Sequence, residues 1–289
     1  MSLHSHCLVC NSSNLKPLSA YQKAHLCKCG SCGFVFAQKI PTEQELIEYY
    51  DGYGRNDYLS PVTIKRYNEL LDAMEPFRKS NKLLDVGCGI GYFLEVAKER
   101  GWEVHGTEYT DRAMEICTAK GIQMKQGKLD PANYEPGSFD VITSFEVLEH
   151  INNPLEETNN FNQLLRKGGL VYLTTPNFNS LLRHRLKERY NVITYPEHLS
   201  YYTPSTLKKI FTQCGFRKLK IQTTGISLTR LKTSQGQTSQ AFISETSDDE
   251  QLRNKIEEKK YLQLAKNMVN GTLTLCGVGD SLKGWFVKK

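Results

Sequence analysis

The sequence of 289 residues has no apolar run near the length of about 18 residues that a bilayer-spanning helix requires. Its first residues do not form a charged segment leading into an apolar stretch, so we expect no secretory signal and a cytoplasmic protein. It also has little excess charge, because 37 Lys and Arg face 31 Asp and Glu, a net charge of +6. This balance is compatible with phosphorylated ligands but is too small to indicate nucleic-acid binding. With 39% hydrophobic and 24% charged residues, the composition is typical of a globular chain.

Two common nucleotide-binding motifs are also absent. The chain has no G-x-x-x-x-G-K-[ST] phosphate loop. Its glycine-rich stretch at residues 87–91 does not match the dinucleotide fingerprint G-x-G-x-x-G/A, because Tyr92 or Leu94 stands where the third glycine belongs. The sequence therefore predicts neither a P-loop protein nor a dinucleotide-dependent oxidoreductase.

Cysteine, in contrast, is concentrated at one end, since five of the nine cysteines lie within the first 32 residues. Cys7 and Cys10 form one C-x-x-C pair, and Cys29 and Cys32 form another after 18 intervening residues. Without export, clustered thiols indicate metal ligands rather than disulfides, and this spacing is typical of a four-thiolate zinc site. Because four thiolates leave no open coordination position, we expect the Zn²⁺ to be structural.

One ambiguity remains in this ligand set, because Cys27 could replace Cys29 with a poorer spacing. Residues 24–26 and 34–36 look like short strands, so the pattern predicts a zinc ribbon over residues 1–40. Residues 41–80 are expected to form a linker or lid and a leading helix. Four tyrosines favour the lid, although the same residues could simply pack the ribbon onto the core: Tyr49, Tyr50, Tyr53 and Tyr58.

The middle of the chain alternates between strand-like and helix-like segments. Apolar runs predict strands at residues 82–86, 102–107, 122–126, 138–144 and 170–175. Capping and stop signals predict helices at residues 92–100 and 111–120, and from Asn153 to Gly168. This alternation predicts an α/β fold with a parallel sheet covered on both faces, and ligands in such folds bind beyond the carboxyl ends of the strands.

A glycine loop follows the first of these strands. Asp85 is followed by Gly87, Gly89 and Gly91, a spacing that brings bare backbone close to a ligand at a helix N-terminus. Glu108 ends the next strand, 21 residues after Gly87, where a carboxylate can accept hydrogen bonds from both ribose hydroxyls. The combination predicts a nucleoside-binding site.

The stretch from Leu84 to Gly91 resembles motif I of the class I S-adenosylmethionine-dependent methyltransferases. Residues 139–154, 165–177 and 196–216 resemble later segments of the same family, so the resemblance covers about residues 80–225. It implies a seven-stranded Rossmann-like sheet with the core at residues 81–230. Residues 231–289 would then hold an insertion, a helix at residues 249–267 and an antiparallel final strand at residues 281–287. A zinc ribbon with this core resembles bacterial enzymes that methylate sugars or make surface polysaccharides.

The resemblance also implies roles for individual residues. Asp85 would hold the loop and the methionine end of the cofactor, Glu108 would bind the ribose, and Tyr109 would pack on the adenine. Phe145 and Glu146 would lie beside the sulfonium. The complete set of expected cofactor contacts is Asp85, Gly87, Cys88, Gly89, Gly91, Tyr92, Phe93, Glu108, Tyr109, Leu129 and Phe145.

For catalysis, the resemblance points to His198 as the base that takes a proton from the acceptor. Glu197 would orient His198 or act itself, and Glu146 is a further candidate. A structural role for His198, and a solvent-exposed helix-start role for Glu146, remain alternatives. His150 is expected to be a packed, hydrogen-bonded residue.

The predicted function is methyl transfer from S-adenosylmethionine to a small molecule, with a nucleotide sugar or a related surface-polysaccharide precursor as the first choice. The alternatives are an RNA methyltransferase and a non-catalytic S-adenosylmethionine-binding protein. We expect no nucleic-acid partner, because the basic residues do not form one long patch and residues 144–147 lack the Asn/Asp-Pro-Pro-aromatic motif. The sequence carries no signal for the acceptor atom or the oligomeric state.

Overall fold

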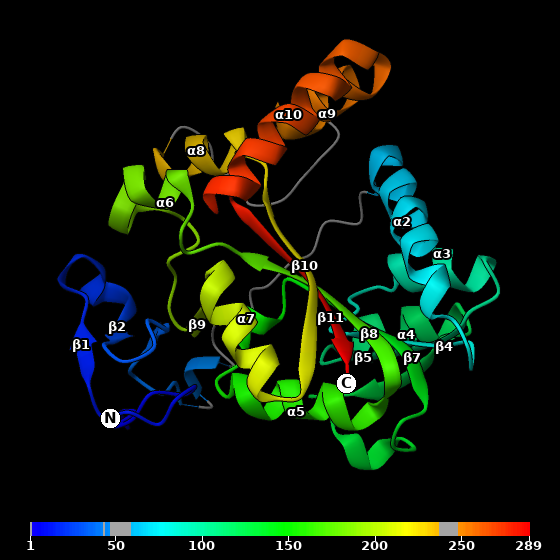
Figure 1. The fold of residues 1–289 in the computed structure, drawn as a ribbon, viewed down its shortest axis with the longest axis horizontal. Helices are drawn as coiled ribbons and strands as arrows, with labels where there is room; N and C mark the ends of the chain where they lie inside the picture. Colours follow the sequence, from blue (N-terminus) through cyan, green and yellow to red (C-terminus); the bar gives the residue numbers. More distant parts are fainter. Residues whose placement is uncertain (1, 43, 47–58, 237–247) are drawn as a thin grey trace.

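The computed structural model describes residues 2–42, 44–46, 59–236 and 248–289, and these residues form two sheets (Figure 1). A small sheet near the N-terminus carries the cysteine pairs, and a seven-stranded sheet forms the body of the protein. Tyr49, Tyr50, Tyr53 and Tyr58, the tyrosines of the expected lid, lie outside the described residues.

The large sheet has the strand order β10-β11-β8-β7-β4-β5-β6. Its strands are β4 (Lys82–Val86), β5 (Glu103–Glu108), β6 (Gln123–Gln126), β7 (Phe139–Phe145), β8 (Leu165–Pro176), β10 (Phe216–Thr224) and β11 (Ser281–Lys288). The five strands from β4 to β8 are parallel, and β11 runs antiparallel between β8 and β10. The strand order reverses next to β4, so the carboxyl ends of β4 and β7 mark the expected ligand site.

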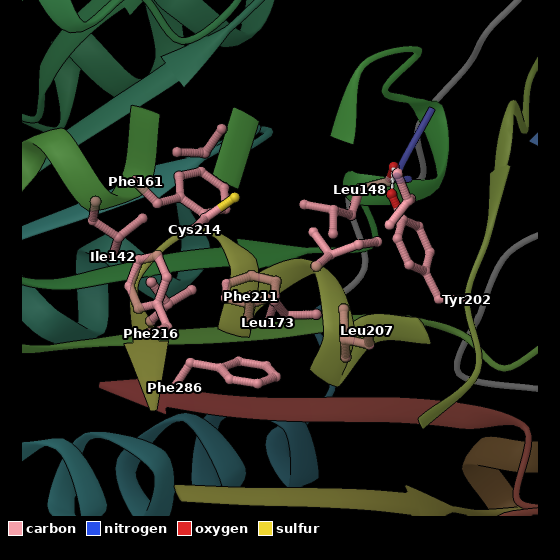
Figure 2. Close-up of a cluster of buried hydrophobic side chains, with 14 of the residues drawn as sticks. Ile142, Leu148, Phe161, Leu173, Tyr202, Leu207, Phe211, Cys214, Phe216 and Phe286 are labelled. Atoms are coloured by element: carbon pink, nitrogen blue, oxygen red, sulfur yellow. Dashed lines mark hydrogen bonds between the residues drawn. The ribbon is translucent and has the colours of Figure 1, made fainter. Parts of the chain in front are cut away.

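Helices cover both faces of this sheet (Figure 1). One face carries α2 (Pro61–Met74), α3 (Tyr92–Glu99) and α4 (Asp111–Ala119), and the other carries α5 (Pro154–Leu164) and α7 (Pro204–Gln213). Each face has its own buried cluster. Figure 2 shows the cluster on the α5 and α7 side, where Phe161, Phe211 and Phe286 pack against Ile142 and Leu173. The predicted layered α/β fold is confirmed.

One helix ends earlier than the glycines suggested. The helix beginning at Asn153 was expected to continue to Gly168, but α5 ends at Leu164 and Gly168 lies within β8. Leu165 is fully buried opposite Phe139 of β7, and Arg166 donates from Nε to Asp140 Oδ1 at 2.5 Å. These tertiary contacts draw the segment into the sheet.

The C-terminal region is more helical than the sequence indicated. The region expected to begin with an insertion starts inside α8 (Leu228–Ser234), and the helix α9 (Asp248–Glu258) follows. The single helix expected at residues 249–267 is two helices, because the chain breaks at Lys259 before α10 (Lys260–Cys276). In Figure 1, α9 and α10 project together beyond the sheet. No helix in the described residues combines the length and apolarity needed to span a membrane.

The small sheet recruits a strand from far along the chain. β1 (Leu15–Pro17), β2 (Leu26–Cys29) and β3 (Val35–Ala37) are consecutive, but the fourth strand is β9 (Ser200–Tyr201). Val35 pairs with Tyr201 and Phe36 with Ser200. The sequence analysis did not predict β9, because its pairing partner is more than 160 residues away and leaves no local signal. The ribbon is thus joined to the core by backbone hydrogen bonds.

The stacked pair of Phe211 and Phe286 tests the packing of the α7 face. Their ring centroids lie 4.1 Å apart at an interplanar angle of 12°, and both side chains are fully buried. Phe286→Ala should lower the free energy of unfolding by about 3–5 kcal/mol, the usual effect of deleting a buried aromatic ring. Urea denaturation measures this change. Leu219→Ala on neighbouring β10, where the side chain is half exposed, should change it by less than about 0.5 kcal/mol; similar losses in both variants would contradict the packing.

Candidate functional site

The loop between β4 and α3 has a backbone that only glycine adopts easily. Gly87 has a φ of +70°, and a Cβ there would lie 2.5 Å from Val147 Cγ2. Gly91 has a φ of +76°, and its Cβ would lie 2.8 Å from Cys117 Sγ. The glycines are therefore required by the backbone and by close neighbours, and they leave bare peptide groups at the start of α3.

Asp85 connects the loop to the neighbouring strand. Its side chain is only 2% exposed, and Thr143 of β7 donates from Oγ1 to its Oδ1 at 2.7 Å. This bond joins the carboxyl ends of β4 and β7 at the place where the strand order reverses. Asp85 thus fixes the strand that precedes the loop to β7, and its role towards the loop and the cofactor stays a prediction.

Glu108 lies at the carboxyl end of β5, next to the same loop. The backbone N–H of Gly89 donates to Glu108 Oε2 at 2.9 Å, and the N–H of Tyr109 donates to Oε1 at 2.8 Å. The adjoining Tyr109 side chain is 66% exposed. A carboxylate against the glycine loop and an exposed aromatic ring beside it can bind the ribose and the base of a nucleoside.

Of the other expected cofactor residues, Phe93 and Leu129 are buried, and Cys88 and Tyr92 are partly exposed. Phe93 and Leu129 are buried core side chains, and the Phe93 ring lies 5.0 Å from that of Phe145. Tyr92 lies under Lys120, whose Nζ is 4.8 Å from the ring centroid. Cys88 is half-buried, with its Sγ 4.0 Å from Met124 Sδ. Phe93 and Leu129 are thus packed in the two buried clusters of the sheet, and their contact with the cofactor stays a prediction.

Glu146 directly follows β7 and has an unusual backbone. Its φ of +53° is in the left-handed region that is uncommon for residues other than glycine. Its N–H donates to the Thr174 carbonyl at 2.9 Å, and its exposed carboxylate lies 3.9 Å from Arg230 Nη2. Strained backbone is concentrated at functional sites, so this geometry supports a role for Glu146.

His198 and Glu197 lie beside this strand end but do not pair with each other as the sequence suggested. His198 Nδ1 donates to the Val192 carbonyl at 2.7 Å, whereas Thr194 Oγ1 donates to Glu197 Oε2 at 3.0 Å. Burial and the neighbouring His150 lower the pKa of His198 to about 4. A ring with this pKa is a weaker proton acceptor than a free imidazole, so catalysis by His198 stays a prediction.

Two residues that the sequence analysis gave no chemical role complete this part of the site. Glu149 and His150 lie in the short turn η4 (Leu148–His150), and with His198 they bring their ligand atoms within 4.8 Å of one another. His150 Nδ1 donates to the Glu197 carbonyl at 2.8 Å, which agrees with its expected packed state. The signal available in the sequence was the adjacent pair of Glu149 and His150 shortly after a predicted strand. The third residue of the cluster, His198, is 48 residues beyond His150.

Several cations lie on the other side of Glu146. Lys283 of β11 is opposite Thr174, the residue whose carbonyl accepts from Glu146. Burial lowers the pKa of Lys283, and the nearby guanidinium groups of Arg66 and Arg253 lower it further. Burial and Arg253 likewise lower the pKa of Arg66. Partly buried cations that repel one another favour an anionic ligand.

The four predicted zinc ligands lie together in the ribbon. Cys7, Cys10, Cys29 and Cys32 bring their sulfurs within 4.8 Å of one another, with Cys7–Cys32 and Cys10–Cys29 separations of 3.5 Å. Cys27 lies outside this cluster, and burial raises the pKa of its thiol to about 12. The donor set fits a structural Zn²⁺ and resolves the ambiguity in favour of Cys29.

Comparison with known proteins agrees with this geometry. Residues 58–221 match a family model described as a methyltransferase domain. Among curated proteins, a ubiquinone biosynthesis O-methyltransferase of Leptothrix cholodnii is 31% identical over 106 residues, 34% of this chain and 45% of that protein. The corresponding protein of an Azoarcus species is 34% identical over 105 residues, with the same coverage. This chain spans less than half the length of these curated relatives.

Solved structures share the fold at low sequence identity. A SAM-dependent methyltransferase from Archaeoglobus fulgidus superposes with a TM-score of 0.51 at 20% identity, covering 84% of this chain and 98% of that one. Phosphoethanolamine N-methyltransferase 2 of Haemonchus contortus, in complex with S-adenosyl-L-methionine, gives a TM-score of 0.54 at 19% identity, covering 88% and 61%. At these identities the likeness extends to the fold alone.

The cysteine cluster leads to a specific prediction about zinc. Cys29→Ser should abolish the zinc that remains after dialysis against a weak chelator, because three thiolates hold the ion far less tightly than four. Cys27→Ser is the matched control, since it removes a nearby buried thiol outside the cluster, and it should retain one zinc per chain. Elemental analysis measures both. Zinc lost from Cys27→Ser and kept by Cys29→Ser would contradict the assigned ligands.

Proposed function

This chain belongs to the methyltransferase domain family, and we propose that it transfers the methyl group of S-adenosylmethionine to a small anionic metabolite. A nucleotide sugar or a related surface-polysaccharide precursor is the first candidate. The proposal rests on one observation: a glycine-rich loop and a group of cations lie at the same edge of the sheet. A glycine loop with Glu108 lies on one side of Glu146, and a group of cations lies on the other.

The cofactor side is supported by the loop between β4 and α3. S-Adenosylmethionine has a ribose with two hydroxyls, and Glu108 at the end of β5 would accept from them. Tyr109 would cover the adenine with its exposed ring. Asp85 would keep the loop in place from below through Thr143. Phe145 would present an aromatic edge towards the methionine end.

S-Adenosylmethionine supplies a methyl group on a positively charged sulfur, and the remaining thioether leaves without charge. The chain therefore has mainly to align the acceptor with the methyl carbon and to exclude water. Glu146 has its strained backbone between the two sides of the site, and Tyr67, Phe93 and Phe145 form an aromatic cluster beside it. Glu146, Tyr67 and Phe145 would form the walls around the point of transfer, and the buried Phe93 would support them from the core.

The acceptor side is supported by charge. Arg66 of α2, Arg253 of α9 and Lys283 of β11 come from three different elements and lie near enough to influence one another's pKa. Arg253 is paired with Glu250 at 3.6 Å, and a phosphate or pyrophosphate group would offset the remaining repulsion among the cations. The curated relatives are named O-methyltransferases of ubiquinone biosynthesis, which suggests an oxygen as the acceptor atom, and a phenolic hydroxyl is therefore the second acceptor that we propose.

We predict that Glu108→Ala weakens binding of S-adenosylmethionine at least several-fold, because ribose hydroxyls left unpaired in a buried site cost about 1–3 kcal/mol. Glu103→Ala is the matched control, since Glu103 lies on the same strand at the end away from the loop. Calorimetry measures both affinities. Equal affinities would show that Glu108 does not bind the cofactor, and thermal unfolding separates this effect from a collapsed loop.

We further predict turnover of S-adenosylmethionine with nucleotide sugars and a decrease of at least tenfold in kcat/KM with Lys283→Met. Lys208→Met removes a lysine on α7 remote from the site and should retain full activity. The measurement is release of S-adenosylhomocysteine across a panel of nucleotide sugars, phenols and RNA. Turnover only with phenols would support the second acceptor. RNA binding that weakens steeply with salt, together with RNA turnover, would overturn the small-molecule proposal.

A further inference from the structure

We infer that Glu149, His150 and His198 form a second metal site, which binds a divalent first-row transition ion beside the methyl-transfer position. One carboxylate oxygen and two imidazole nitrogens lie within 4.8 Å of one another. Ligands on one ion at about 2.1 Å stand roughly 3–4 Å apart, so a small inward movement of these side chains suffices. This site is separate from the four cysteines of the ribbon.

The hydrogen bonds of both histidines involve Nδ1, which makes Nε2 the candidate metal-binding nitrogen of each ring. A backbone carbonyl only accepts, so His150 Nδ1 and His198 Nδ1 must carry the protons that they share with Glu197 and Val192 at 2.8 and 2.7 Å. In a neutral ring the lone pair is then on Nε2. Metal-binding histidines commonly donate their other ring N–H to a backbone carbonyl, which fixes both the tautomer and the ring orientation.

Glu149 supplies a carboxylate whose burial is unfavourable unless a cation lies beside it. Its side chain is 3% exposed, and Thr175 donates from Oγ1 to Oε2 at 2.9 Å. Within the described ranges no Lys or Arg nitrogen lies within 4.0 Å of its oxygens. A bound cation would stabilise the ionised form, because a buried carboxylate needs a compensating charge.

The donor set indicates which ions fit. Two imidazoles and one carboxylate with open positions favour Fe²⁺, Mn²⁺, Co²⁺ or Zn²⁺, whereas Mg²⁺ and Ca²⁺ prefer oxygen ligands. The backbone of the site is rigid, since the N–H of Leu199 donates to the Glu149 carbonyl at 2.7 Å. This bond holds the segment of His198 against the segment of Glu149.

The position of the site suggests what the ion does. Val147, two residues before Glu149, is the side chain that a Cβ on Gly87 would strike, so the metal ligands adjoin the cofactor loop. An ion there would hold an oxygen of the acceptor and lower the pKa of that hydroxyl. His198 would then act as a metal ligand and not as the proton acceptor. This role depends on the proposed methyl transfer, whereas metal binding itself does not.

Titration of the full-length, zinc-loaded protein with Mn²⁺, Co²⁺ and Zn²⁺ tests the site. We expect one additional ion per chain, detected with Mn²⁺ by loss of the free-ion EPR signal. Glu149→Gln and His198→Asn should each lower the affinity at least 10–100-fold. His184→Asn, which changes an exposed histidine on α6 (Leu181–Leu186), is the matched control and should bind like the wild type. Absence of an additional ion with all three metals, or unchanged affinity in both variants, would overturn the inference.

Two further measurements keep the test decisive. If the variants unfold, pulsed EPR of Mn²⁺ bound to the wild type must show coupling to two imidazole nitrogens; coupling to none or one contradicts the assigned ligands. Affinity for S-adenosylmethionine is measured in the same samples. If the protein binds the metal but not S-adenosylmethionine, the metal site stands and the proposed function is wrong. If it binds S-adenosylmethionine but no additional metal, only the metal site is wrong.

Discussion

The backbone of Leu199 connects the parts of this protein that matter for its chemistry. Its N–H donates to the Glu149 carbonyl at 2.7 Å, and its carbonyl accepts from the Ala37 N–H at 2.8 Å. One residue therefore links the turn after β7, the loop that carries His198 and the third strand of the ribbon. The pairing of β3 with β9 continues the same connection. The position of His198 thus depends on this joint as well as on its own hydrogen bond to the Val192 carbonyl.

This connection gives the cysteine-rich head a function beyond its own folding. Phe34 and Phe36 of the ribbon share a buried cluster with Leu148 and Tyr202, and Tyr202 donates its hydroxyl proton to the Leu148 carbonyl at 3.1 Å. Zinc bound to the head stabilises the small sheet, and the small sheet supports the wall of the site. A structural metal can in this way affect chemistry at a distance, because the ribbon and the site share both a core cluster and a strand pair.

The site also shows where stability is given up for function. Glu149 is a buried acid, Lys283 and Arg66 are cations in a crowded environment, and Glu146 adopts a strained backbone. Each of these features raises the free energy of the folded chain when no ligand is bound. Their concentration at the carboxyl ends of β7 and β8, with a layered apolar core beneath, is typical of a binding site. The apolar clusters on the two faces of the sheet provide the stability that tolerates them.

Local patterns were sufficient for much of this description. Apolar runs with glycine punctuation predicted every parallel strand, and the spacing of Cys7, Cys10, Cys29 and Cys32 predicted one cluster. Motif I and Glu108 lie close together in sequence, and the structure places Glu108 against the glycine loop as the pattern predicted. These features depend on residues that are near neighbours along the chain, or on a strand order that parallel topology dictates.

The remaining features depend on contacts between distant segments, which local sequence does not encode. Burial of Leu165 opposite Phe139 ended α5 early, and β9 joined a sheet formed more than 160 residues before it. Glu149, His150 and His198 became one cluster only because η4 and the segment before β9 pack together. The choice of Cys29 over Cys27 depended on position along β2, because both side chains point to the same face of the strand and only Cys29 lies close to the other three cysteines. The residue types were already evident in the sequence, but their relative positions required the packing of the whole chain.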